Sequence, residues 1–500
     1  MEILAGPPGC GKTTSLIKIV EDELTSGTHP DRIGYVSFTR RAAEEAITRA
    51  CERFRLLPRD LPNFRTLHSL CFRFLGVRAS EMLTGRQLEE FGELVGHKIT
   101  GRFSLEDGTI FGFEKGDRLL FMENLARVRE QPLRALYDED DDDLSFWEVE
   151  RFQKALAQYK IDNGVVDYTD LLQQFVAMEA GPQLDVLLVD EAQDLSVLQW
   201  DVVRKLSRGC RRVVIAGDDD QAIYRWAGAD VETFVAMPGE VRVLDQSWRV
   251  PRAVQAVADM VVGRISHRRP KVWRPRDEQG LVQRHGSQDS IDLTSGEILV
   301  LGRNRYILRE YERRIRSAGY LYEFQGVSSI RPTLLDAVLT WERLRQDREG
   351  VLAVHARRMY EFMSMGKGWK RGHKQLPEFQ DEEPVTWELL TQQGGLLVRK
   401  DVLWYDALDK MSLQDVAYIR AARRRGENLL APPRIRLSTI HGMKGGEAQR
   451  VVLLTDMAAR THEEARRWPE DESRVWYVAA TRAREELHIV APRTNRFYDL

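Results

Sequence analysis

Two adjacent carboxylates at the end of an apolar run are the first candidates for chemistry in this sequence. Residues 186–189 read Val-Leu-Leu-Val, which indicates a buried strand, and Asp190 and Glu191 follow directly. In a parallel sheet covered by helices, ligands bind at the carboxyl ends of the strands. Asp190 could hold Mg²⁺ there, and Glu191 could polarise a water molecule. The alternative, a solvated acidic turn after a strand, is about equally common for so short a pattern.

A glycine-rich loop near the N-terminus is the second candidate. Residues 6–13 read GPPGCGKT and match GxxxxGK[ST], between an expected strand at Glu2–Ala5 and an expected helix over residues 14–23. Such a loop turns N–H groups around a phosphate at the positive end of a helix. Lys12 is expected to reach the β- and γ-phosphates, and Thr13 to bind Mg²⁺. The expected phosphate-binding residues are Gly6, Gly9, Cys10, Gly11, Lys12, Thr13 and Thr14, with Cys10 at a free position of the motif.

Polar and aromatic residues follow other predicted strands. Gln221, after the expected strand 212–216, can sense a γ-phosphate through its amide, and Tyr224 and Trp226 offer faces for stacking. After the expected strand 33–38, Thr39 and Arg40 suit contacts with a phosphate backbone. Phe38 could stack on a base or belong to the core, whereas a lone histidine such as His68 is usually a helix cap or a core partner.

Composition narrows the class of protein. With 500 residues, 43% hydrophobic and 30% charged, the chain is expected to form two to four globular domains. No apolar run approaches the ~18 residues that span a bilayer, and the start lacks the features of a signal peptide. The four scattered cysteines indicate a reducing compartment and no structural zinc. We therefore expect a cytoplasmic protein without membrane contact.

The net charge of −3 gives no sign of a polyanion partner, so nucleic-acid binding would need a local concentration of cations. Basic stretches at residues 264–276 and 420–425 offer this, and an acidic run at 138–143 offsets them. Each of these stretches is more often a solvated surface than a binding face.

The pattern of elements predicts two α/β halves, each interrupted by a helical insertion. Strands are expected at residues 241–244, 298–301, 434–440, 450–454 and 486–490, and a helix is expected to start at Asp167. The predicted boundaries are 1–76 with 160–237 for the first half and 77–159 for its insertion. The second half covers 238–331 with 434–500, and its insertion covers 332–433.

Eight segments, taken in order, resemble superfamily 1 helicases of the UvrD/PcrA/Rep type across nearly the whole chain. They are GPPGCGKT at residues 6–13, SFTRRAA at 37–43, RTLHSL at 65–70, VDEAQD at 189–194, GDDDQAIYRWAGA at 217–229, DQSWR at 245–249, TIHGMKGGE at 439–447 and YVAATRAREEL at 477–487. The resemblance implies two RecA-like P-loop domains with parallel sheets, ATP in the cleft between them and single-stranded DNA across their tops.

The resemblance also implies roles for individual residues. Lys12, Glu191, Gln221, Arg249 and Arg482 would be catalytic, the two arginines acting as arginine fingers. Thr13 and Asp190 would hold Mg²⁺, Trp248 would stack on the adenine and Glu447 would contact the ribose. The residues along the DNA would be Phe38, Thr39, Arg40, His68, Tyr224, Trp226 and His441.

The expected function is an ATP- and Mg²⁺-dependent DNA helicase that moves 3′ to 5′ on single strands and unwinds duplexes at junctions in replication, repair or recombination. Three departures from the family pattern bear on this. A first strand that starts at Glu2 is expected to leave no room for the glutamine motif that reads adenine in relatives. Trp248 stands for a usual Tyr, and Ala227 stands for a usual Arg.

Several alternatives remain open at this point. The shortened second insertion favours a translocase that strips proteins from single strands and barely unwinds. A nucleotide-gated DNA-binding scaffold would not need a complete catalytic set, and a small-molecule kinase would leave the second half unexplained. RNA is a possible track, because stacking contacts do not inspect the 2′-OH. The sequence predicts no particular protein partner.

Overall fold

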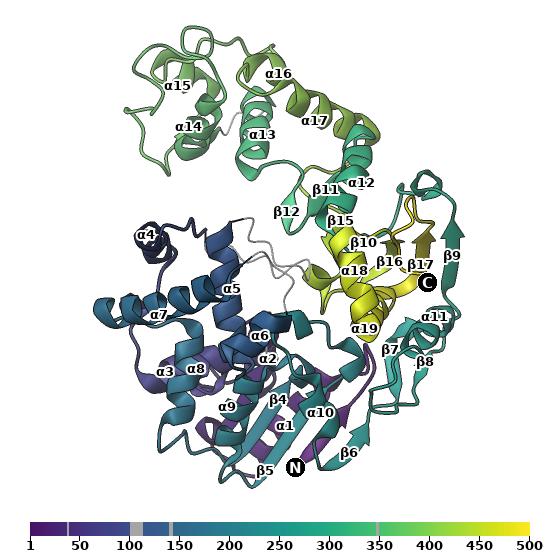
Figure 1. Cartoon of the computed structure of the whole chain (residues 1–500). Helices are drawn as coiled ribbons and strands as arrows, with labels where there is room; N and C mark the ends of the chain where they lie inside the picture. The colour runs from purple at the N-terminus through teal and green to yellow at the C-terminus, as the bar shows by residue number, and fades with distance from the viewer. Residues whose placement is uncertain (38–39, 101–113, 140–143, 347–349) are drawn as a thin grey trace. The chain divides into compact units, whose positions relative to one another are not determined.

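The computed structural model describes residues 1–37, 40–100, 114–139, 144–346 and 350–500, and these residues form two compact units. Unit 1 comprises Met1–Ile291, Leu301–Asn304 and Thr439–Leu500, and unit 2 comprises Asp292–Val300 and Arg305–Ser438 (Figure 1). Helices alternate with mainly parallel strands, which confirms the predicted α/β class.

A fully parallel sheet near the N-terminus organises unit 1. Its strands lie in the order β3-β2-β4-β5-β1-β6, and the Figure 1 label for the N-terminus lies beside β6. The strands are β1 (Glu2–Ala5), β2 (Ile33–Ser37), β3 (Phe64–Thr66), β4 (Val186–Asp190), β5 (Arg212–Gly217) and β6 (Glu240–Val243).

Helices cover both faces of this sheet, which explains why its central strands are apolar without alternation. In β4, Val186 and Leu188 face one hydrophobic cluster, and Leu187 and Val189 face another. The first cluster includes residues of α1 and α2, and the second includes residues of α3, α8 and α9. These helices are α1 (Lys12–Thr25), α2 (Arg40–Phe54), α3 (Leu67–Leu75), α8 (Tyr168–Ala177) and α9 (Val197–Ser207). Asp167 caps α8, as predicted for the start of that helix.

The segment predicted as the first insertion is helical where it is described and has its own core. Phe91, Leu119, Met122 and Phe152 lie in one buried cluster separate from the sheet. The helices are α4 (Gly85–Val95), α5 (Lys115–Val128), α6 (Leu133–Glu139) and α7 (Phe146–Asn163). Part of the acidic run, residues 140–143, lies outside the described residues.

The remainder of unit 1 places a second set of elements beside the first sheet. Strand β7 pairs in parallel with β8, and β17 pairs in parallel with both β16 and β9. Helix α19 packs against α11 and against the short helix η5 that follows β5. The elements are η5 (Asp219–Gln221), α10 (Val231–Ala236), β7 (Gln246–Pro251), α11 (Arg252–Val262), β8 (Arg274–Arg276), β9 (Leu281–His285), β16 (Ala448–Leu454), α18 (Ala459–Arg467), α19 (Pro469–Ala480) and β17 (Ala483–Val490).

Unit 2 is mainly helical and uses tryptophans as core residues. Trp341 is fully buried, packs edge-on against Trp387 and donates its indole N–H to the carbonyl of Val402 (3.1 Å). Strand β11 pairs in parallel with β15 and antiparallel with β12. The elements are α12 (Arg305–Ser317), β11 (Tyr322–Phe324), β12 (Val327–Ser328), α13 (Pro332–Gln346), β13 (Val351–Leu352), α14 (Ala353–Glu361), β14 (Pro384–Val385), α15 (Trp387–Gln392), α16 (Trp404–Ala407) and α17 (Leu413–Arg425), with β10 (Ile298–Gly302) and β15 (Ile435–Thr439) at its boundaries with unit 1.

The predicted strands are present, with ends that shift by a few residues; β17, for example, begins at Ala483 and not at Glu486. Among the helices of the described ranges, none combines the length and the apolarity that crossing a membrane requires.

Candidate functional site

The predicted phosphate loop joins β1 to α1 and has the backbone of an anion cradle. Gly9 and Gly11 adopt positive φ angles of 72° and 82°. A Cβ on Gly9 would lie 2.4 Å from the Cβ of Arg249, so this close approach requires glycine. The first N–H groups of a helix have no acceptor within the helix, and Gly11 caps α1 without a side chain. The loop therefore fits the phosphates of a nucleotide.

Lys12 is buried at the centre of this loop. Its Nζ donates to the carbonyl oxygens of Gly6 (2.9 Å) and Pro7 (3.4 Å). Burial opposes its charge, but Cys10 and the carboxylates of Asp218 and Glu191 outweigh that effect and raise the pKa of Lys12. The ammonium is therefore retained where a polyphosphate would lie. The Cys10 thiol is buried against Gly6, and burial raises its pKa.

Asp190 ends β4 next to the loop, as predicted for a Mg²⁺ ligand. Its Oδ2 accepts hydrogen bonds from the hydroxyls of Thr13 (2.9 Å) and Tyr35 (2.8 Å). The Thr13 hydroxyl and the Asp190 carboxylate are hard oxygen donors of the kind that Mg²⁺ prefers alongside water and phosphate. The two residues therefore fit the ion they are expected to hold.

Glu191 has an electrostatic environment different from that of its neighbour. Burial, together with the charge of Glu191, raises the pKa of Asp190 to about 6. Burial acts in the same direction on Glu191, but Lys12 and Lys444 outweigh it and lower its pKa. Its backbone is in the left-handed region (φ 54°), which a non-glycine residue adopts only when its surroundings hold it there. Glu191 is therefore held as an anion, as a general base requires.

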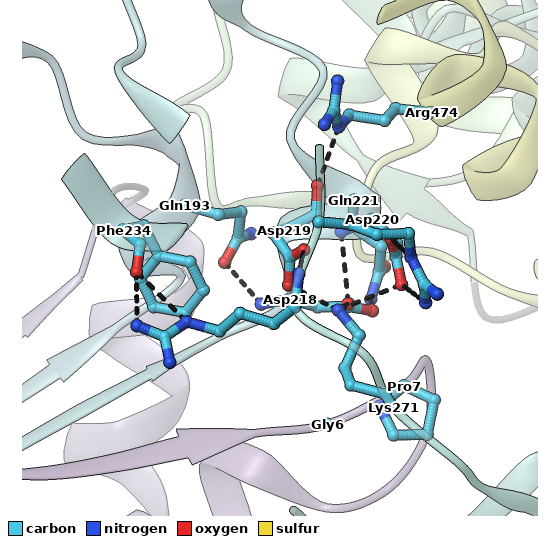
Figure 2. Close-up of polar contacts among 12 residues, drawn as sticks. Gly6, Pro7, Gln193, Asp218, Asp219, Asp220, Gln221, Phe234, Lys271 and Arg474 are labelled. Atoms are coloured by element: carbon cyan, nitrogen blue, oxygen red, sulfur yellow. Dashed lines mark hydrogen bonds and ion pairs between the residues drawn. The ribbon is translucent and has the colours of Figure 1, made fainter. Parts of the chain in front are cut away.

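Gln221 lies within a chain of hydrogen bonds that starts at Glu191. Gln193 donates to Glu191, and its Oε1 accepts from the backbone N–H of Asp218 (2.9 Å). Asp218 in turn accepts from Gln221 Nε2 (2.7 Å), as Figure 2 shows. Gln221 Oε1 accepts from Arg482 Nη2 (2.9 Å). The predicted water-activating residue, γ-phosphate sensor and second arginine are thus joined in one network.

The two arginines predicted to act as arginine fingers both lie at this site. Arg482 is fully buried, and burial together with the nearby charge of Arg249 lowers its pKa to about 9, which leaves it charged at neutral pH. Arg249 forms an ion pair with Glu447, the predicted ribose contact.

Strand β7 brings Trp248 to the phosphate loop. The backbone N–H of Trp248 donates to the carbonyl of Gly9 (2.9 Å), and the Ser247 hydroxyl donates to that of Pro8 (2.7 Å). The Trp248 side chain is 73% exposed, so its ring face is accessible to a planar ligand beside the loop.

Three of the residues predicted to line DNA lie together. The His441 ring lies 6.1 Å from that of Tyr224 and 6.2 Å from that of Trp226. Trp226 and His441 line a cavity of about 630 Å³ whose wall also includes Phe121 from α5, Arg129 just after that helix, and Arg303. Burial beside Arg303 holds the pKa of His441 well below its ordinary value, so the imidazole is neutral.

The other predicted DNA contacts are not part of this group. His68 lies on α3, edge-on to Tyr168 at 5.9 Å, and burial lowers its pKa to about 4. Phe38 and Thr39, and the side chain of Arg40, lie outside the described residues.

Sequence reasoning missed residues that complete the network. Lys444 donates to Asp194 (2.7 Å) and to the backbone carbonyl of Gln221 (2.6 Å), and Tyr35 supports Asp190. Lys444 lies within segment 439–447, one of the eight segments that resemble the helicase family, and this position could have marked it as a site residue. Tyr35 lies inside an apolar strand and gave none.

The pattern of residues 264–276 favours a solvated surface, and the structure corrects this prediction for Arg268 and Lys271. Lys271 is buried among Asp218, Asp219 and Asp220, and Arg268 pairs with Asp220. These acidic partners lie about 50 residues earlier in the chain, beyond the reach of a local pattern.

The phosphate loop, the parallel sheet and the acidic pair together define a P-loop protein of the α/β class. Residues 1–242 match the model of the UvrD/REP helicase N-terminal domain, and residues 401–494 match that of the UvrD-like helicase C-terminal domain. These matches cover more than half of the chain, which belongs to the UvrD/Rep helicase family.

Relatives of described function support this membership. The chain is 27% identical over 206 residues to the ATP-dependent DNA helicase PcrA of Bacillus subtilis, covering 38% of this chain and 27% of that protein. It is 25% identical over 401 residues to a probable DNA helicase of Mycoplasma pneumoniae, covering 71% and 70%. A third relative, the RecBCD enzyme subunit RecB of Mycolicibacterium smegmatis, is 27% identical over 220 residues, covering 39% and 20%. For PcrA and RecB, the aligned part is thus about a quarter of the relative's length or less.

Proposed function

We propose that the chain hydrolyses ATP and uses the cycle to move 3′ to 5′ along single-stranded DNA and to open duplexes at junctions. The observation that carries this proposal is that two short segments each contribute residues both to the nucleotide region and to the cavity at Trp226 and His441. Residues 221–226 run from the nucleotide network at Gln221 to the cavity at Trp226, and residues 441–447 run from the cavity at His441 to Glu447. A change at one region is therefore communicated to the other through a few residues.

The side chains of this site suit phosphoryl transfer to water. The oxygen of the water forms a bond to the γ-phosphorus, the bond from that phosphorus to the ADP oxygen breaks, and Glu191 accepts the proton of the water. Lys12, Arg249 and Arg482 stabilise the negative charge that spreads over the transferred group. Mg²⁺ held by Thr13 and Asp190 would neutralise charge on the phosphates.

Coupling to DNA follows from where these groups originate. Gln221 precedes Tyr224 by three positions and the cavity residue Trp226 by five. Lys444, from the segment that carries His441, donates to the backbone carbonyl of Gln221. Stacking of a base on Trp226, worth ~1–3 kcal/mol, would therefore act on the segment that holds the γ-phosphate sensor.

The deciding experiment measures ATP hydrolysis with and without single-stranded DNA, for the wild type and for Glu191→Gln. We expect DNA to stimulate the wild type, and the variant to lose about 10²–10⁴-fold of the rate, the contribution of a general base. A fluorescent ATP analogue should still bind the variant. Glu179→Gln, which changes an exposed carboxylate of the same unit, is the matched control and should behave as the wild type. Hydrolysis that is indifferent to DNA would overturn the proposal, and single-stranded RNA would be tested as the track.

Unwinding and polarity are separate measurements. Duplexes with a 3′ or a 5′ single-stranded tail distinguish the two directions, and the 3′-tailed substrate should be opened. Stimulated hydrolysis and displacement of a protein block without strand separation would identify a translocase in place of a helicase.

A further inference from the structure

The three aspartates that precede Gln221 form a buried carboxylate cluster (Asp218, Asp219 and Asp220) around one ammonium. Lys271 Nζ lies 2.9 Å from Asp218 Oδ1 and 3.0 Å from Asp220 Oδ2, and it also forms an ion pair with Asp219. Figure 2 shows these contacts converging on the lysine. The side chains of all four residues are at most 1% exposed.

The segment that carries Lys271 is anchored on both sides of the cluster. Arg268 binds Asp220 with two hydrogen bonds (2.7 and 2.6 Å), and the backbone N–H of Arg269 donates to Asp219 (2.8 Å). From α19, Arg474 donates to the backbone carbonyls of Asp219 (3.1 Å) and His267 (2.8 Å). The segment therefore joins the end of α11 to η5 and α19.

Charge balance gives Lys271 a specific task. Burying carboxylates without counter-charges is costly, and removing one partner from a buried ionic group leaves the others uncompensated. Burial opposes the charge of Lys271, but the three carboxylates outweigh it and raise its pKa. In turn Lys271, with Lys12, lowers the pKa of Asp218 against the effect of burial.

Asp218 connects this cluster to the proposed reaction. One of its oxygens contacts Lys271, and the other accepts from Gln221 Nε2 (2.7 Å). Gln221 directs its amide oxygen to Arg482 (2.9 Å). Within the described residues, no hydrogen bond or ion pair joins Lys271 to a proposed nucleotide-binding residue, so its effect on the reaction is expected to pass through Asp218 and Gln221.

We propose that Lys271 is a positioning residue for ATP hydrolysis, holding Asp218 ionised and fixed so that Gln221 keeps its contact with Arg482. This inference deepens the proposed function and rests on it. Because Lys271 lies in a segment anchored to α19, which leads to Arg482, a movement of that segment would change the position of Gln221 together with the arginine.

The test is a charge-compensation cycle between Lys271→Met and Asp219→Asn. K271M keeps a long side chain but leaves the carboxylate cluster without its central cation. We expect DNA-stimulated kcat to fall about tenfold or more, while the Kd of a fluorescent ATP analogue changes less than about threefold. The Asp219 side chain contacts Lys271 and the backbone N–H of Arg269, and no hydrogen bond joins it to Gln221. D219N therefore removes one negative charge and leaves the contacts of Gln221 with Asp218 and Arg482 in place. The double variant should recover most of the lost rate.

Arg269→Ala is the matched control. The Arg269 guanidinium belongs to the same segment but donates to the backbone carbonyls of Phe234 (3.0 Å) and Met237 (2.7 Å), not to a carboxylate. R269A should destabilise the fold to some degree, as a thermal melt would record, without a fall in kcat like that of K271M and without rescue by D219N.

A pH profile separates charge from packing. Among the described residues, the charged and titratable groups that face the cluster include Cys10, Lys12, Asp259, Arg268, Lys271, Arg474 and Tyr477. Without Lys271, the pKa of Asp218 rises, and a proton can replace the missing cation. The kcat of K271M relative to the wild type should therefore rise as the pH falls from 8 to 6. A lost packing contact would give a ratio independent of pH.

The outcomes are distinct. If the wild type shows no DNA-stimulated hydrolysis, the proposed function fails. If the wild type shows DNA-stimulated hydrolysis and K271M has the same kcat, the role of Lys271 is overturned. The role is also overturned if D219N does not restore the kcat of a folded K271M. If K271M does not fold, the double variant decides: a folded, active double variant supports charge balance, and an unfolded one contradicts it.

Discussion

The nucleotide region and the cavity at Trp226 lie on shared segments but have opposite character. At the phosphate loop, the arginines are already partnered: Arg249, whose side chain is 17% exposed, pairs with Glu447, and the fully buried Arg482 donates to Gln221. At the cavity, the central groups are neutral rings, and in the described part of the chain the buried indole N–H of Trp226 has no hydrogen-bond partner. The central groups of the first region are charges, whereas the central groups of the second are neutral rings within a wall that also carries charged side chains such as Arg303 and Glu472.

This difference indicates how each region would work. Fixed, desolvated charges stabilise a transition state without reorganising during the reaction. Neutral aromatic faces bind any base with similar strength, which suits a track that must be released at each step. Arginines of the cavity wall that are not buried, such as Arg129 and Arg460, can supply attraction to phosphates without reading sequence.

The largest effect is expected in the nucleotide region, on the rate of ATP hydrolysis. Arg482→Ala should lower DNA-stimulated hydrolysis by about 10³-fold or more, the range of an arginine finger, with little change in DNA affinity. Rapid-quench measurement of phosphate release would report the rate. Arg466→Ala is the control, because Arg466 is an exposed arginine of α18 that belongs neither to the nucleotide region nor to the cavity lining. Wild-type hydrolysis by the Arg482 variant would remove this arginine from the mechanism.

On the aromatic side, the expected effect is smaller and of a different kind. Trp226→Ala should weaken binding of a single-stranded oligonucleotide by about 1–3 kcal/mol, the value of one stacked base. Binding of a fluorescent ATP analogue should not change. Fluorescence anisotropy with a labelled oligonucleotide measures the loss. Trp147→Ala is the matched control, because Trp147 is a 63% exposed tryptophan of α7 that does not line the cavity. Equal losses in both variants would contradict a specific role for the cavity.

Prediction from sequence succeeded where a local pattern determines a local structure. The spacing of glycines, Lys12 and Thr13 is set by the loop itself, and β4 is recognisable because both faces of the sheet are covered. The helix start at Asp167 follows in the same way from its capping pattern.

Prediction was incomplete where partners are distant in sequence. Residues 264–276 resemble a solvated basic surface, and nothing local reveals that Lys271 is buried by Asp218–Asp220. Tyr35 was indistinguishable from other core residues of β2, although its hydroxyl supports Asp190. Such contacts depend on which strands lie side by side, information that periodicity does not contain.

The finest test of the comparison is the pH dependence of DNA binding. The pKa of His68 is lowered to about 4 by burial, and that of His441 also lies well below its ordinary value. A histidine with a lowered pKa gains its proton only below that pKa, so both rings stay neutral between pH 8 and pH 6. The ratio of the affinities of the wild type and His441→Gln for single-stranded DNA should therefore change less than about twofold over this range at constant ionic strength. The slope of log K against log[salt] should also stay constant, because it counts the cations that contact phosphate. If affinity and slope both increased towards pH 6 in the wild type but not in His441→Gln, that ring would be a phosphate-binding cation, and the division between a charged nucleotide region and a neutral stacking region would fail.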